Sequence, residues 1–421
     1  MNRSFDTACC VAGGGPAGLM LGYLLARAGV DITVLEKHAD FLRDFRGDTI
    51  HPSTMEIMHD LGLLEEFLTL PHQKVPDLAA RFSNESLRIA DFSHLQVAAP
   101  YIAMMPQWDF LNFLARNAGA YPNFRLLMQT EATGLLIEDD GVAGITARDP
   151  VGPLTIRAAL TIAADGRGSL LRNASGLTVT DFGAPMDVLW FRLSRQPGDT
   201  DQTQGRFERG HIFVMLNRGD YWQCAYVIAK GADARIRAAG LAAFRDGLRP
   251  LLPVATTRAD EITGWDQVKL LNVQVNRMPK WWRPGFLCIG DAAHAMSPVG
   301  GVGVNLAVQD AVAAANILHA PLLAGSVLPA DLAAVQARRA WPTRVIQGLQ
   351  LAMQRRIIEA TLTNQQPTRP PALLRLMTRI PGLNRLPARL IGLGVRPEHP
   401  APALIKTRLA PCGSRKRYPS A

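Results

Sequence analysis

The most constraining feature of this sequence is a glycine-rich segment near its beginning, Gly13-x-Gly15-x-x-Gly18. It follows an apolar run at residues 7–12, which predicts a strand, and precedes residues 19–28, whose apolar positions recur at helical spacing. In such a unit the first glycine permits a tight turn, the second lets the backbone approach a diphosphate, and the third allows the helix to pack closely on the strand. The segment therefore predicts the start of a dinucleotide-binding fold.

A second strand is predicted at residues 32–35, which are apolar and mostly β-branched, and it ends at Glu36. A carboxylate at this spacing accepts hydrogen bonds from a ribose and repels a 2′-phosphate, so it favours FAD or NAD over NADP. The dinucleotide-binding residues expected in this first part of the chain are Gly13, Gly15, Pro16, Ala17, Gly18, Glu36 and Lys37.

Three later segments favour FAD over NAD. Asp165 and the pair Gly290-Asp291 each follow an apolar strand, which places a carboxylate at the strand end where α/β sheets bind ligands. A glycine-rich loop then leads into a predicted helix at residues 305–318, and its free backbone N–H groups suit the anionic edge of a flavin. The residues expected to contact the flavin there are Pro298, Gly301, Gly303, Val304 and Asn305.

With these motifs in this order, the sequence resembles the p-hydroxybenzoate hydroxylase family of FAD-dependent aromatic hydroxylases over roughly residues 6–320. The resemblance places Arg46 and Gln107 where the family has flavin-contacting side chains. It assigns residues 165–172 to both FAD and pyridine-nucleotide handling. Val302 stands where many members carry Gln, a departure that concerns the subfamily rather than the cofactor.

The resemblance implies a monooxygenase that uses NAD(P)H and O2. NAD(P)H would reduce FAD, and a flavin hydroperoxide would then transfer one oxygen atom to an aromatic or polyketide-like small molecule. The chain has no second nucleotide-binding fingerprint, so the nicotinamide donor would dock only transiently. A reductase or oxidase that inserts no oxygen, and a non-catalytic FAD-binding scaffold, remain as alternatives. No catalytic residue is assigned, and no metal is expected.

The predicted fold is α/β: a Rossmann-type FAD-binding domain with an inserted β-sheet substrate domain and a helical C-terminal tail. The FAD-binding domain is expected in two parts, 1–184, with some substrate-domain strands, and 279–329. The strand-rich insertion is expected at 185–278, with one helix at 234–248, and the tail at 330–421. The expected substrate-binding residues are Trp190, Phe213, Met215, Trp222 and Tyr226, although the same residues also suit one face of a half-buried sheet.

The positive charge is concentrated in the tail. Residues 330–421 contain 16 Lys/Arg and 3 Asp/Glu, whereas the whole chain has a net charge of +9, so a nucleic-acid-binding function is not favoured. The five cysteines have no metal-site spacing and indicate a reducing, cytoplasmic location. Two interpretations of the tail are open: a peripheral contact with a membrane, or packing on the FAD-binding domain. On either one, residues from about Pro367 onward are expected to be dispensable for flavin binding.

Overall fold

The structure is a computed structural model. It describes residues 3–42, 49–82, 85–200, 203–208, 210–363, 370, 375–376, 380, 382–383 and 385–405.

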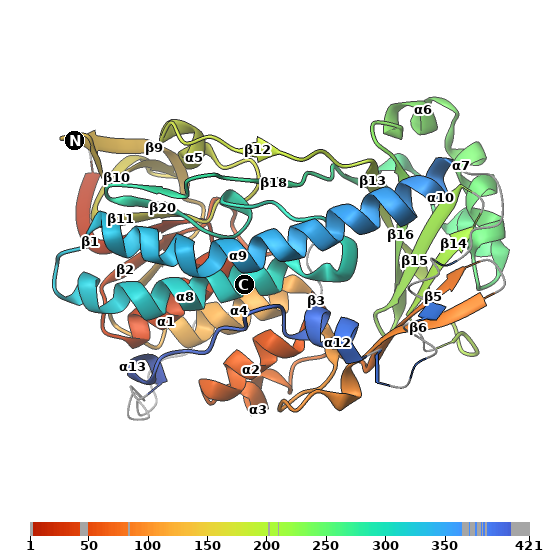
Figure 1. Cartoon of the computed structure of the whole chain (residues 1–421). Helices are drawn as coiled ribbons and strands as arrows, with labels where there is room; N and C mark the ends of the chain where they lie inside the picture. Colours follow the sequence, from red (N-terminus) through yellow and green to blue (C-terminus); the bar gives the residue numbers. More distant parts are fainter. Residues whose placement is uncertain are drawn as a thin grey trace.

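A mostly parallel sheet of eight strands forms the first lobe (Figure 1). At its centre β1 (Arg3–Ala12) pairs in parallel with β2 (Ile32–Leu35) on one side and β11 (Gly152–Ala163) on the other. The remaining strands are β8 (Phe124–Leu127), β9 (Glu131–Glu138), β10 (Gly141–Asp149), β19 (Trp282–Arg283) and β20 (Phe286–Cys288). The carboxyl ends of β1, β2, β11 and β20 face one edge of the sheet, which is where sheets of this kind bind ligands.

Packed helices complete the core of the first lobe. α1 (Pro16–Arg27) lies between α4 (Gln107–Ala118) and α8 (Gly303–Leu323), and α9 (Pro329–Met353) packs on α8. α1 starts with a proline, whose fixed φ and missing N–H suit the first position of a helix. The segment Val299–Leu323 is the one helix in the described part of the chain that is long and apolar enough to cross a membrane; its apolar window is 67% buried, as in the core helix of a soluble protein.

A seven-stranded sheet forms the second lobe, to the right in Figure 1. Its order is β17 (Lys269–Leu271), β13 (Met186–Ser194), β16 (Tyr221–Ala229), β15 (His211–Asn217), β14 (Gln204–Glu208), β5 (Asp77–Phe82) and β6 (Glu85–Asp91). β5 and β6 precede the expected insertion, and β5 joins the sheet by pairing in parallel with β14. Two segments that pair as β12 (Thr180–Asp181) and β18 (Asn276–Arg277) connect the lobes (Figure 1).

The smaller elements complete the two lobes. Beside the first lobe lie β3 (Thr49–Ile50), β4 (Gln73–Val75), β7 (Ile102–Met104), α2 (Pro52–Asp60), α3 (Leu64–Phe67) and α5 (Leu170–Ala174). On the second sheet, the single helix predicted at 234–248 is instead two helices, α6 (Asp233–Ala238) and α7 (Leu241–Leu248). Gly240 separates them because its φ of 91° lies in the left-handed region, which ends a right-handed helix.

The C-terminal region crosses both lobes. α9 continues through a π-helical segment (Gln354–Glu359) into α10 (Ala360–Thr363), which packs against β15. α12 (Arg385–Gly392) then packs against β6, where Ala388 is fully buried, and α13 (Pro402–Ile405) returns to the first lobe, where Leu404 is fully buried. Residues 385–405 therefore pack on the protein, as one of the two interpretations of the tail expected.

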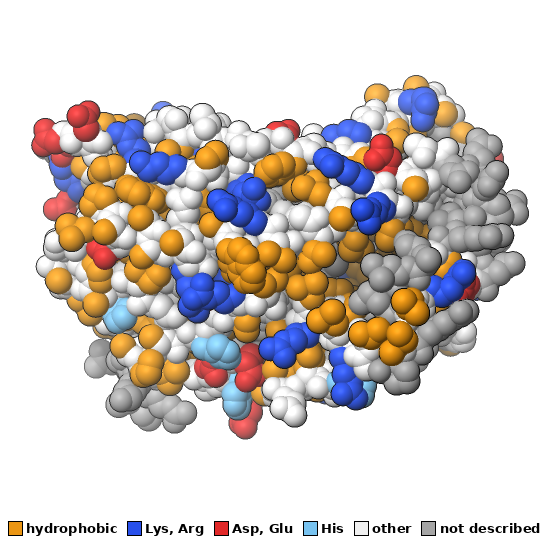
Figure 2. Space-filling view, viewed as in Figure 1, with side chains coloured by type: hydrophobic (Ala, Val, Ile, Leu, Met, Phe, Trp, Pro, Cys, Tyr) orange, Lys and Arg blue, Asp and Glu red, His pale blue; other side chains and the backbone are white. Residues whose placement is uncertain are grey.

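Figure 2 shows the face of the molecule that α9 crosses. Hydrophobic side chains lie along it among scattered Lys and Arg side chains, with few acidic ones. Three large apolar residues of α9 are exposed to solvent: Trp341, Leu349 and Met353. Residues 406–421 and the predicted break at Pro367 lie outside the described residues. A membrane contact through the tail stays a prediction.

Candidate active site

In the turn after β1, the fold requires glycine at two positions and does not require it at a third. A Cβ on Gly13, whose φ is 110°, would lie 2.3 Å from the Ala164 carbonyl oxygen, and a Cβ on Gly18 would lie 1.9 Å from the Gly13 carbonyl oxygen. Gly15, the N-cap of α1, has an ordinary φ of −80°, and a Cβ there would meet nothing within 4 Å. The fold tolerates a side chain at Gly15, and the open space it faces lies before a helix N-terminus, which favours an anion such as a diphosphate.

Glu36 is fixed beside this turn. Its carboxylate is buried and accepts hydrogen bonds from the backbone N–H of Gly14 (3.2 Å) and of His38 (3.0 Å). The structure thus brings Glu36 next to the turn, as the sequence predicts for a ribose-binding carboxylate. Of the neighbouring predicted residues, Lys37 is exposed and Ala17 is buried, with its Cβ beside Gly290.

The two later acidic motifs lie side by side at the sheet edge. Asp165 accepts a hydrogen bond from the Leu171 N–H with one oxygen, while its other oxygen is buried and has no partner among the described residues. Asp291 pairs with Arg167, 3.3 Å away. The buried Arg172 joins the two segments, because its guanidinium donates to the carbonyl oxygen of Ala292 at 2.9 Å.

The glycine-rich loop is held against the segment that begins at Thr49. The Thr49 hydroxyl donates to the Gly301 carbonyl oxygen at 2.9 Å, and a Cβ on Gly301 would lie 2.4 Å from that hydroxyl. The Asn305 side-chain oxygen accepts from the N–H of His51 (2.9 Å) and the hydroxyl of Thr54 (2.7 Å). The Asn305 amide also donates to the carbonyl oxygens of Thr49 and Gly301. The side chain of Asn305 therefore braces the loop.

The remaining predicted residues of the loop divide between a short turn and the start of α8, which begins two residues earlier than predicted. Pro298 caps a short 3-10 turn, Val299–Gly301, and α8 starts with Gly303 and Val304. Gln107 is the first residue of α4, shortly after β7, which pairs with β3 at Thr49. Arg46 lies outside the described residues.

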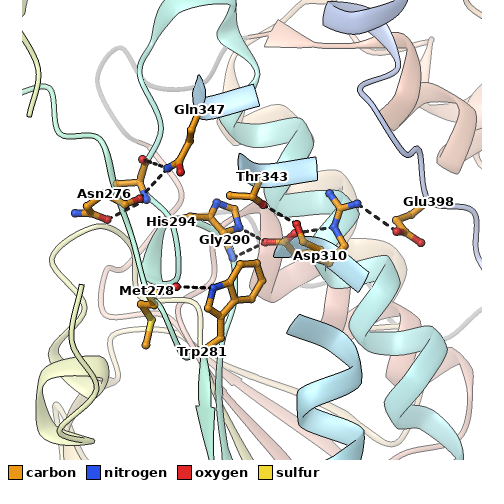
Figure 3. A network of polar contacts seen from close by, with 11 residues as sticks. Asn276, Met278, Trp281, Gly290, His294, Asp310, Thr343, Gln347 and Glu398 are labelled. Carbon is orange, nitrogen blue, oxygen red and sulfur yellow. Dashed lines mark hydrogen bonds and ion pairs between the residues drawn. The ribbon is translucent and has the colours of Figure 1, made fainter. Parts of the chain in front are cut away.

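Sequence reasoning missed a buried polar network beneath the Gly290-Asp291 motif (Figure 3). Asp310 of α8 is fully buried; one of its oxygens accepts from the Gly290 N–H (3.0 Å) and contacts His294 Nε2 (2.5 Å). Its other oxygen accepts from Arg339 Nε of α9 at 2.9 Å. Burial raises the pKa of Asp310, but His294 and Arg339 together outweigh it and hold that pKa below its ordinary value. The signal in the sequence was a single carboxylate within an apolar, alanine-rich helix.

The arrangement fits FAD. The space before Gly15 and α1 suits the diphosphate, and Glu36 lies where a ribose would be held. The unpartnered buried oxygen of Asp165 is an acceptor that a hydroxyl donor of the ligand can satisfy.

Comparison with known proteins identifies the family. A family model described as an FAD binding domain matches residues 6–347. The 6-methylpretetramide 4-monooxygenase of Streptomyces rimosus is 30% identical over 372 residues, which cover 87% of this chain and 88% of the relative. The chain belongs to this FAD-binding family. It is an FAD-dependent monooxygenase of the p-hydroxybenzoate hydroxylase type, which confirms the predicted family and cofactor.

Two further comparisons agree with this assignment. Para-nitrophenol 4-monooxygenase of Pseudomonas sp. (strain WBC-3) is 27% identical over 333 residues, which cover 75% of this chain and 78% of the relative. The crystal structure of a probable FAD-dependent monooxygenase from Pseudomonas aeruginosa has the same fold, with a TM-score of 0.72 and 21% identity. The match covers 85% of this chain and 98% of that one. The predicted α/β fold class is confirmed.

In this FAD-dependent monooxygenase, four of the five predicted substrate-binding residues lie in a core on the far face of the second sheet. Phe213, Met215 and Trp222 are almost fully buried there, and Tyr226 packs against the same cluster. Phe244 of α7 stacks edge-on against both Phe191 and Tyr226, so α7 covers this face. Their size, which suggested a substrate lining, fills the space beneath α7 instead.

The opposite face of the sheet is the one that meets the flavin loop. Trp190 lies on this face in a cluster that includes Val299 of the loop and Ile358 of the segment after α9. Trp190 Nε1 is buried and has no hydrogen-bond partner in the described part of the chain. The small and medium apolar residues that share this face are Val188, Ile212, Val214, Ala225 and Val227.

Two histidines, one in the second lobe and one after the Gly290-Asp291 motif, are held by their neighbours. His211 Nδ1 lies 2.8 Å from the Tyr226 hydroxyl on the α7-covered face, and burial lowers the pKa of His211. His294 packs on Trp281, with ring centroids 5.0 Å apart, and contacts Asp310. Neither ring lies on the sheet face that meets Val299.

Proposed function

We propose that this monooxygenase hydroxylates a polycyclic aromatic, polyketide-like small molecule with NAD(P)H and O2. The observation that carries the proposal is the face of the second sheet that is turned toward Val299. On this face, small apolar residues such as Val214 and Ala225 surround the indole of Trp190. Such a face accepts a flat apolar ring system and offers one hydrogen-bond donor. The relative that matches this chain over nearly its full length acts, by its name, on 6-methylpretetramide.

FAD would be held by the residues predicted from the sequence. The N-terminus of α1 at Gly15 binds the diphosphate, Glu36 a ribose, and Asp291 the ribityl hydroxyls, while the loop from Pro298 to Asn305 presents backbone N–H groups to the flavin ring. Bound FAD, reduced by NAD(P)H, supplies the chemistry that activates O2. The carboxyl of Asp165 accepts a further hydroxyl of the cofactor.

The substrate would lie between the 298–305 loop and the second sheet. Val299 and Val214 exclude water from this space, and Ile358 closes it from the C-terminal side. Trp190 Nε1 donates to a carbonyl or phenolic oxygen of the substrate and thereby orients the ring to be hydroxylated. The cysteines of the described part are all free and buried, which supports our proposal of a cytoplasmic location.

The test compares Val214→Phe with wild type on tetracyclic aromatic polyketides and on simple phenols. We expect Val214→Phe to raise KM for the tetracyclic compounds about tenfold or more while the flavin spectrum stays unchanged, because the new ring fills the substrate space without touching FAD. The measurements are NAD(P)H consumption and incorporation of labelled oxygen. NAD(P)H consumption without labelled product from either class would instead indicate a reductase or oxidase.

A further inference from the structure

The C-terminal segment reaches the flavin-binding motif through buried charges. Glu398 is 3% exposed, and its Oε1 accepts from Arg339 Nη1 at 3.2 Å. Arg339, itself 1% exposed, donates from Nε to Asp310, and Asp310 accepts from the N–H of Gly290 (Figure 3). A continuous chain of hydrogen bonds therefore joins the C-terminal segment to the backbone of the Gly290-Asp291 motif.

The same segment contacts other elements that hold the cofactor site. We call residues 391–405 the C-terminal strap. At one end the carbonyl oxygen of Ile391 accepts from Nδ1 of His51, whose backbone N–H binds Asn305. At the other end the carbonyl oxygen of Ile405 accepts from Arg27, in the last turn of α1. The strap thus spans from the flavin loop to the helix that faces the diphosphate.

Between these ends the strap is tied to α8. The Asn316 side chain donates to the carbonyl oxygen of His399 (2.9 Å) and accepts from the N–H of Ala401 (2.7 Å). Leu404 is fully buried in the same core as α1 and α8. These contacts fix the backbone on both sides of Glu398, so its carboxylate is delivered to Arg339 in a defined position.

We propose that the C-terminal strap is part of the FAD-binding apparatus, in which Glu398 acts as a positioning residue for Gly290-Asp291 through Arg339 and Asp310. This reverses the expectation that residues beyond about 367 are dispensable for flavin binding. The strap lies beyond the region matched by the family model, which ends at residue 347. The proposal rests on FAD as the cofactor and is independent of the substrate.

The physical reason is the balance of buried charge. Asp310 and Glu398 are two buried carboxylates, and the guanidinium of Arg339 lies between them. Arg338, which is partly exposed, supplies the second positive charge to Glu398 at 2.8 Å. Glu398 holds the Nη1 end of the Arg339 guanidinium, so its loss leaves that end without an ionic partner and lets Arg339 shift, which loosens its hold on Asp310. Gly290 has a φ of 58° and depends on that carboxylate for its N–H partner, so the motif loses its fixed geometry.

The experiment replaces Glu398 by Gln in the full chain and measures how fast FAD leaves the holoenzyme after dilution into an FAD-trapping apoprotein. We expect about tenfold faster release, as for the weakening of one charge-assisted hydrogen bond. Glu138→Gln is the matched control. It makes the same change in a Glu–Arg pair of the first lobe, and its exposed contact with Arg157 does not reach Asp310, so FAD release should match wild type.

A second readout separates positioning from general stability. Thermal unfolding is followed for the apoprotein and the holoenzyme, together with the visible circular dichroism of the bound flavin. Positioning predicts that Glu398→Gln shrinks the gain in Tm caused by FAD and alters the flavin signal. An equal fall in both Tm values, with an unchanged flavin signal and unchanged release, would make Glu398 a purely structural brace and overturn the proposal.

A measurement on the wild-type chain covers the case in which the variant does not fold. Coupling between two sites is reciprocal, so FAD binding must stabilise the strap if the strap stabilises bound FAD. We expect amide hydrogen exchange in residues 391–405 to slow when FAD is added to the apoprotein. Exchange in α6, which lies in the second lobe, serves as the internal control. Equal exchange of the strap with and without FAD would overturn the proposal.

Discussion

The two sheets of this enzyme differ in where they leave room for a ligand. The eight-stranded, mostly parallel sheet offers its strand ends, where backbone N–H groups and glycines such as Gly15 leave room for a charged cofactor. For the seven-stranded sheet we propose that the substrate binds on a face, the side of Val214 rather than Phe213, where side-chain size decides what fits. A substitution of the same chemical kind should therefore act on cofactor binding in one lobe, and on stability or substrate choice in the other.

The largest expected effect is the loss of FAD from Gly15→Val. The backbone of Gly15 accepts a side chain without strain, so the protein should fold, but the valine occupies the space expected for the diphosphate. We expect a colourless protein with a normal far-ultraviolet circular dichroism spectrum that takes up no added FAD. Gly247→Val is the control, because Gly247 in α7 also faces open space but belongs to the second lobe. If Gly15→Val purifies with FAD at wild-type occupancy, the diphosphate is bound elsewhere.

The next effect distinguishes the two faces of the second sheet. Phe213→Ala should lower the free energy of unfolding by about 3–5 kcal/mol, because it leaves a cavity beneath α7. The neighbouring Val214→Ala, on the other face, should cost about 1 kcal/mol and change KM instead. Urea denaturation gives the first quantity and steady-state kinetics the second. A change in KM from Phe213→Ala that exceeds the one from Val214→Ala would contradict this assignment of the faces.

The smallest of these effects concerns acid stability and compares histidines in the two lobes. Burial lowers the pKa of His51 from 6.5 to about 4, so between these values the unfolded chain takes up a proton that the folded protein refuses. The free energy of unfolding should therefore fall by roughly 3 kcal/mol as the pH drops from above 6.5 to 4. His51→Asn keeps a donor for Ile391 and should remove this slope, whereas His211→Asn, at a half-buried site, should change it less. An unchanged slope in His51→Asn would show that other groups cause the acid sensitivity.

The sequence predicted the elements that the backbone requires, but it did not predict which way the side chains of a strand point. β1, α1, β2 and α8 overlap the ranges that periodicity predicted, although three of them extend further. For β1 and α1 the glycine turn at Gly13 and Gly18 leaves the chain few alternatives. The face of a strand cannot be inferred in this way. Trp190 and Phe213 are both large and apolar, and only the packing of α7 decides which one points toward the flavin loop.

Long-range contacts were the other limit of sequence reasoning. The pairing of β5 with β14 joins segments more than a hundred residues apart, and no local pattern announces it. The contact of Glu398 with Arg339 is of the same kind: each residue alone resembles an ordinary surface charge, and only the fold buries them together. Asp310 was the one member of that network with a signal of its own, as a charge inside an apolar helix.

The bond between Arg27 and the carbonyl oxygen of Ile405 has a consequence for how the protein is made. The ribosome releases Ile405 378 residues after Arg27, and β1 must wait for β11 before its second edge is paired. The first lobe therefore cannot reach its final form while most of the chain is still being translated. A nascent chain that stalls before the strap emerges should expose its unfinished interior to chaperones and proteases. On our proposal for the strap, tight binding of FAD has to wait until Ile405 has left the ribosome.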